Sequence, residues 1–103
     1  MPNADVFQWV SVLAEGDTNV ERKTIAGLGA SLKRIQIKAG AVADRHSHPH
    51  EQFVIVLEGG GRLECEAGAV VLHPDTVLHF TSGAWHSAVF DTDTVLLEVD
   101  LMA

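Results

Sequence analysis

Two histidines and a glutamine form the pattern in this sequence that is best suited to chemistry. His46 and His48 are two residues apart, and Gln52 follows them beyond Pro49. In an extended strand, side chains two residues apart share one face and lie about 7 Å apart at the backbone, so both imidazoles can reach one ion. The amide oxygen of Gln52 can also ligate a divalent ion. The pattern therefore predicts a metal site.

His50 has the same parity as the two histidines but stands behind Pro49. Proline interrupts a strand, and the alternation of side chains need not continue through the turn that it starts. Gln52 opens the apolar run 53–57, which suits the first inward-facing position of the next strand. We therefore expect His46, His48 and Gln52, rather than His50, to face a common ion.

Short apolar runs must carry these residues. Glycine, proline and aspartate turn signals divide the chain at short intervals, and the runs between them are rich in valine, isoleucine, leucine and phenylalanine. Such runs are too short for helices, and their β-branched content is typical of strands. A series of strands without long helical segments indicates a sandwich or barrel, so we expect an all-β domain. The runs are 32–37, 53–57, 69–72, 76–80 and 94–99.

An apolar segment at residues 6–14 precedes these runs. Its three valines, with Phe7 and Trp9, favour a strand over a helix. An apolar leading strand often has no place in its own barrel and can pair with a neighbouring subunit. We therefore expect a homodimer.

The spacing of Gly40, His46, His48 and Gly59 resembles the first motif of the cupin superfamily, Gly-x5-His-x-His-x3 or 4-Glu-x6-Gly, with Gln52 where the family usually has glutamate. The resemblance extends from about residue 32 to residue 99. It implies a double-stranded β-helix, or jelly-roll, barrel of the small RmlC-like type. We interpret residues 1–103 as a single cupin domain, with its core at about 30–100 and N-terminal strands, which can form a dimer, within 1–29.

The second cupin motif, Gly-x5-Pro-x-Gly-x2-His, has two placements here. Gly68, Pro74 and His79 fit the spacing, but Thr76 replaces the second glycine; alternatively, Gly83 and His86 fit, and Thr81 replaces the proline. His86 follows a glycine turn and begins an apolar run, whereas His79 lies late in its own run. The resemblance therefore implies His86 as the fourth metal ligand, with His79 as the alternative.

Three imidazoles and an amide leave the charge of a divalent ion uncompensated. We expect such a site to hold one Zn, Ni, Mn or Fe ion and to attract a small anionic oxygen ligand. Glu98 is the candidate general base beside the metal. Other inward polar groups are expected from Arg34 or Gln36, from Asp100 and from Trp85 near the mouth.

Within the family, the run His46-Ser-His-Pro-His-Glu-Gln52 is similar to the pectin-degradation cupins, which convert unsaturated uronate sugars to linear keto sugars. Those relatives continue with an aromatic and arginine-containing tail after their last strand, where this sequence reads Asp100-Leu-Met-Ala. Three hypotheses follow. They are a Lewis-acid isomerase, lyase or cyclase that acts on a sugar acid or similar anion, an Fe- or Mn-dependent dioxygenase, and a metal- or ligand-binding module without turnover.

Charge and composition exclude other classes. Fourteen acidic and seven basic residues give a net charge of −7, and the basic residues are dispersed, which argues against a nucleic-acid partner. The single cysteine, Cys65, excludes an internal disulfide. The sequence shows no secretory signal and no apolar stretch of about 20 residues, so we expect a cytoplasmic protein without a membrane partner.

Overall fold

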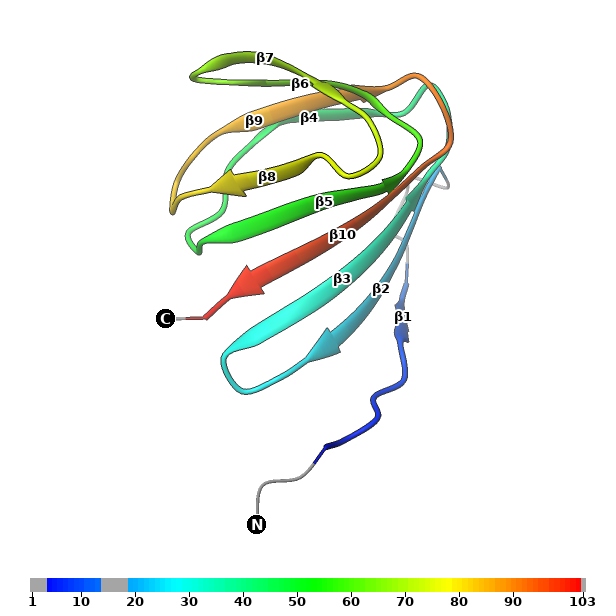
Figure 1. The fold of residues 1–103 in the computed structure, drawn as a ribbon, viewed down its shortest axis with the longest axis vertical. Helices are drawn as coiled ribbons and strands as arrows, with labels where there is room; N and C mark the ends of the chain where they lie inside the picture. The colour runs from blue at the N-terminus through cyan, green and yellow to red at the C-terminus, as the bar shows by residue number, and fades with distance from the viewer. Residues whose placement is uncertain (1–3, 14–18, 103) are drawn as a thin grey trace.

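The computed structural model describes residues 4–13 and 19–102, which form strands in two antiparallel sheets (Figure 1). The strands are β1 (Val10–Val12), β2 (Val20–Ala26), β3 (Ala30–Ile37), β4 (Val42–His46), β5 (Gln52–Glu58), β6 (Gly61–Cys65), β7 (Gly68–Leu72), β8 (Val77–Phe80), β9 (His86–Phe90) and β10 (Thr94–Leu101). Within the described ranges, no helix is long and apolar enough to cross a membrane.

The two sheets lie face to face, and each sheet contains neighbouring strands that are distant in the sequence. The larger sheet has the order β1-β2-β3-β10-β5-β8, and the smaller has the order β4-β9-β6-β7. In the larger sheet β10 lies between β3 and β5, and in the smaller sheet β9 lies between β4 and β6 (Figure 1). This all-β arrangement confirms the predicted jelly-roll fold.

The core lies between the sheets and follows the two-residue period of the strands. In β3 the buried side chains are Ile35 and Ile37, and in β5 they are Val54 and Val56. Leu96 of β10 lies directly opposite Ile35 on one side and Val56 on the other. Because side chains of a strand alternate between faces, one residue in two joins this core.

Position 59, in the turn between β5 and β6, requires a glycine because of its backbone conformation and its close neighbours. Its φ is +79°, and a Cβ atom there would lie 2.2 Å from the backbone oxygen of Asp93. Only glycine combines a positive φ with so close an approach. The glycine that ends the predicted first motif thus serves the packing of this turn.

The five predicted runs correspond to β3, β5, β7, β8 and β10. The predicted strand at residues 6–14 is much shorter in the structure, since only Val10–Val12 form β1 and residue 14 lies outside the described part. β1 pairs with β2 at the edge of its own sheet, with Val10 opposite Thr24. The large sheet therefore has a place for this strand.

Candidate metal centre

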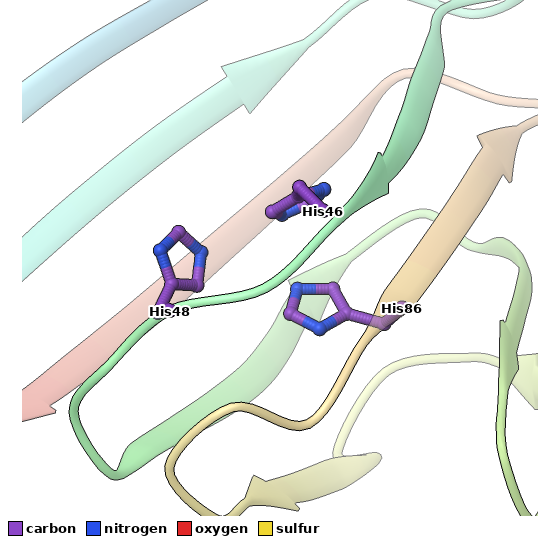
Figure 2. A group of neighbouring side chains, drawn as sticks. All are labelled: His46, His48 and His86. Carbon is purple, nitrogen blue, oxygen red and sulfur yellow. The ribbon is translucent and has the colours of Figure 1, made fainter.

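Three histidines gather at one end of the barrel. His46 is the last residue of β4, His86 is the first residue of β9, and the two are direct partners in the β4–β9 ladder. His48 lies just beyond the end of β4, and its ring turns toward the other two (Figure 2). One ring nitrogen from each histidine can be chosen so that all three lie within 4.8 Å of one another. Metal–nitrogen bonds are about 2.0–2.1 Å long, so small side-chain adjustments suffice for a shared ion.

The imidazole of His46 is oriented for ligation by its own strand. Its Nδ1 lies 2.7 Å from the backbone oxygen of Asp44. A carbonyl oxygen only accepts hydrogen bonds, so Nδ1 donates, and in the neutral ring the lone pair is then on Nε2. A hydrogen bond at the second ring nitrogen is the usual support of a metal-ligating histidine.

The surroundings of the other two rings favour the neutral form. Burial and, to a smaller extent, the neighbouring His46 lower the pKa of His86 to about 4, against an opposing contribution from the backbone of Ala84. Burial also lowers the pKa of His48, with His46 and His50 acting in the same direction. Metal ions bind neutral imidazole, so this environment suits ligation. His86 Nδ1 is, in addition, buried and has no hydrogen-bond partner among the residues that the structure describes.

Gln52 opens β5, as the sequence predicts, and its side chain is only 1% exposed. Its amide nitrogen donates to Asp100 Oδ1 over 2.9 Å and lies 3.4 Å from Glu98 Oε1. Carboxylates accept hydrogen bonds, so the amide nitrogen must face them. The amide oxygen is left buried without a donor, which is a state that a cation relieves. The side chain therefore fits the predicted ligand role, which stays a prediction.

Asp100 is the centre of the polar network behind Gln52. It is 4% exposed, and its carboxylate lies 2.9 Å from Lys33 Nζ and 3.0 Å from His50 Nε2. Burial alone would raise the pKa of Asp100, but hydrogen bonds from Lys33, Gln52 and His50 outweigh burial and lower it. His50 is thus directed to Asp100 and lies outside the group of three histidines, as Pro49 led us to expect.

His79 lies apart from these residues. It belongs to β8, and its Nε2 lies 2.5 Å from Glu51 Oε2 in an exposed ion pair. Its ring packs against Phe53, with centroids 4.7 Å apart. Of the two placements of the second motif, the structure brings His86, and not His79, to His46 and His48.

A cavity of about 390 Å³ opens beside the three histidines, and Glu98 is part of its wall. Burial raises the pKa of this carboxyl group, against an opposing effect of Lys33. A carboxyl group with a raised pKa inside a cavity suits proton transfer. The role of Glu98 as general base stays a prediction.

Lys33 and Arg22 also line this cavity, and the sequence analysis did not anticipate them. We expected Arg34 or Gln36 as the inward polar group of the same strand. This expectation is wrong because the side chains of β3 alternate between its two faces. Ile35 is buried in the core, so Lys33 shares its face and the two even-numbered residues point away. The alternation of Ile35 and Ile37 was the signal that would have identified Lys33.

Comparisons with known proteins agree with this fold. The Cupin domain family model matches residues 33–101. KdgF from Halomonas sp. superposes with a TM-score of 0.78 at 21% identity, over 94% of this chain and 89% of that one. An RmlC-like cupin from Shewanella frigidimarina gives 0.79 at 20% identity, over 90% and 85% of the two chains. Ectoine synthase from P. lautus gives 0.73 at 22% identity, over 82% and 66%. No curated protein sequence matches this chain.

Proposed function

This chain belongs to the cupin family, and we propose that it is a metal-dependent member that acts as a Lewis-acid isomerase, lyase or cyclase on a small oxygenated anion, such as a sugar acid. The observation that carries the proposal is the group formed by His46, His48 and His86, whose ring nitrogens lie within 4.8 Å of one another at the wall of a cavity. KdgF and ectoine synthase share the fold with this chain at low sequence identity, and the proposed reaction class does not rest on them.

His46, His48 and His86 would hold the ion, with the Gln52 amide oxygen as a fourth donor. A bound divalent ion supplies Lewis acidity, which polarises a carbonyl or hydroxyl oxygen and lowers the pKa of bound water. All four donors are neutral, so an anionic oxygen ligand is favoured at the remaining positions. Three imidazole nitrogens and one amide oxygen form a donor set that suits Zn, Ni, Mn or Fe.

Glu98 is the group in the cavity wall that suits proton transfer. Its carboxyl group is half-buried, and Gln52 contributes one long contact to it. Burial raises its pKa, which brings the acid and base forms closer in population near neutral pH than for an exposed glutamate. In the proposed reaction this carboxyl group takes a proton from a carbon or hydroxyl of the ligand and returns it at a neighbouring atom.

Metal content tests the proposal. Purified protein is loaded with Zn²⁺, Ni²⁺, Mn²⁺ or Fe²⁺ and desalted, and bound metal is measured for the wild type, His46→Ala and His86→Ala, with His79→Ala as the matched control. We expect wild type and His79→Ala to retain about one ion per chain, and the other two variants to lose it. A wild type that retains none of these metals overturns the proposal.

Oxygen consumption separates the proposed reaction class from a dioxygenase. The Fe²⁺-loaded protein is supplied with candidate anions under air, and dissolved oxygen is followed with an electrode. Turnover without oxygen uptake supports isomerase, lyase or cyclase chemistry. Stoichiometric oxygen uptake overturns it in favour of a dioxygenase, even if the metal site is present.

A further inference from the structure

We propose that the ligand of this cavity is a small organic anion with an apolar body, bound with its oxygen donors at the histidine end and its body against the barrel interior. The inference rests on the proposed function, because it takes the metal site as the anchor of the oxygen donors. Within the oxygenated anions of the proposed function, it favours those whose body carries few hydroxyl groups and disfavours polyhydroxylated sugar acids.

The cavity is polar at one end and apolar below it, as strands β3 and β10 show. Along β3 the cavity-lining side chains are Lys33, Ile35 and Ile37, in that order from the histidine end. Along β10 they are Glu98 and Leu96. Lys33 lies directly opposite Glu98, and Ile35 lies directly opposite Leu96. The two strands therefore present one charged layer and, one side-chain repeat further in, an apolar layer.

The facing sheet has the same order. His86 begins β9, and Ala88 and Phe90 follow it on the cavity wall. In the larger sheet, Leu78 of β8 lines the cavity opposite Val54 of β5, and Val54 in turn lies opposite Glu98. These two strands are therefore already apolar at the level of Glu98. On β5, β8 and β9, a ligand that reaches past His86 meets hydrocarbon side chains.

The cavity wall offers one cation that the described part of the structure leaves without an ion pair. Lys33 is paired with Asp100 at 2.9 Å. Arg22 of β2 lines the same cavity, and within residues 4–13 and 19–102 it forms no ion pair at or below 4.0 Å. A guanidinium group binds carboxylates through two parallel hydrogen bonds. Arg22, which lies directly opposite Ile35 in the β2–β3 ladder, is therefore the cation of the cavity wall that favours an acidic ligand.

The apolar walls discriminate against a hydroxylated body. A hydroxyl group that enters an apolar environment without a hydrogen-bond partner weakens binding about 5- to 150-fold. An apolar body gains from the same transfer, and burial of a phenyl-sized group corresponds to about tenfold to a hundredfold in affinity. Among anions with the same head group, the cavity should therefore select the one with the apolar body.

Mandelate and gluconate provide a matched pair of probes. Both carry an α-hydroxy carboxylate, but mandelate carries a phenyl body and gluconate a polyhydroxylated chain. Their binding to the Zn²⁺- or Ni²⁺-loaded protein is measured by titration calorimetry at millimolar concentrations. We expect mandelate to bind about tenfold more tightly or better. Equal binding, tighter binding of gluconate, or binding of neither probe overturns the inference.

Two variants of β8 test the apolar wall. Leu78→Asn places a polar group on the cavity side, and Val77→Asn, on the exposed neighbour, is its control. We expect the preference for mandelate to fall about tenfold in the first variant and to persist in the second. Val20→Thr, a nearly isosteric change on the half-buried wall residue of β2, serves if Leu78→Asn does not fold. An unchanged preference in the folded wall variant overturns the inference.

Two variants of β2 test the head-group contact. Arg22→Gln removes this cation from the cavity wall, and Lys23→Gln, the next residue on the opposite face of the strand, is the control. We expect Arg22→Gln to weaken mandelate binding about tenfold, with metal content unchanged. Loss of metal from the wild type would instead defeat the proposed function itself, so the two failures are distinguishable.

Discussion

Gln52 Nε2 donates to Asp100 Oδ1 over 2.9 Å, and the two residues are direct partners between β5 and β10. Both are almost fully buried. A glutamine amide alone can present either its oxygen or its nitrogen to a neighbour. The Asp100 carboxylate removes this choice, because it attracts the nitrogen and leaves the oxygen free. Asp100 thus positions the atom that we expect to face the metal.

Asp100→Asn should therefore weaken metal binding without removing a ligand. The asparagine can accept or donate, so Gln52 can turn its nitrogen toward the histidines. We expect the affinity for Zn²⁺ to fall about 10- to 100-fold, as for other partners of metal ligands. Competition with a chromophoric chelator measures the affinity.

Asp91→Asn, an exposed change in the turn between β9 and β10, is the matched control for that experiment. It should leave the affinity unchanged. Gln52→Ala should weaken binding at least as much as Asp100→Asn. If Asp100→Asn keeps the wild-type affinity while Gln52→Ala loses it, Asp100 does not position the amide. If neither variant changes the affinity, Gln52 is not a ligand.

Metal removal should lower thermal stability. An ion that binds the folded state only, at a free concentration 100 times its Kd, stabilises that state by about 2.7 kcal/mol. For a domain of about this size, the loss corresponds to a fall in Tm of about 10 °C or more. Thermal unfolding with and without a chelator measures the shift. His46→Ala should show no such shift, and an equal shift in that variant would place the stabilising ion elsewhere.

The stability of the metal-free protein should fall as the solution becomes acidic below pH 6.5. The pKa of His86 is about 4 in the folded state, below its ordinary value of 6.5. Between these values the unfolded chain binds a proton that the folded chain does not, so unfolding is favoured as pH falls. Urea unfolding between pH 7 and pH 4 measures the slope. His86→Asn should reduce it, and an identical slope in both proteins would contradict the assignment.

Gly59→Ala should destabilise the fold far more than Gly83→Ala. The two glycines have φ of +79° and +80°, so alanine meets the same backbone penalty at both, about 1–2 kcal/mol. Only at Gly59 does the new Cβ also meet backbone atoms, whereas at Gly83 nothing lies within 4 Å. We expect a loss of about 3 kcal/mol or more for Gly59→Ala. Equal losses by urea unfolding would refute the steric argument.

Local patterns in the sequence were sufficient to predict most of the fold. The runs at 32–37 and 94–99 were identified from their composition, and both are strands. β2 was not identified, because Val20–Ala26 has charged residues at its centre and only its ends resemble an apolar strand. Pairing with β1 on one side and β3 on the other supplies the stability that its own sequence does not indicate.

The candidate site divides in the same way. Strand parity was enough to bring His46 and His48 together. The meeting with His86 depends on the register between β4 and β9, which are far apart in the sequence. The link between Asp100 and Gln52 likewise follows from strand order in the sheet, since β10 inserts beside β5. Long-range pairing of this kind leaves no local signal, so His86 was selected from the family resemblance together with its position after a glycine turn.

The homodimer also remains a prediction, and the described N-terminal residues allow a direct test. Val10 and Val12 are both exposed on β1, and Leu13 is 92% exposed. Exposed apolar side chains on an edge strand favour association with a second chain. Val12→Lys should convert a dimer to a monomer, whereas Leu28→Lys, in the exposed turn between β2 and β3, should not. Light scattering after size-exclusion chromatography gives the mass. A monomeric wild type, or a dimer that survives Val12→Lys, would contradict association through this strand.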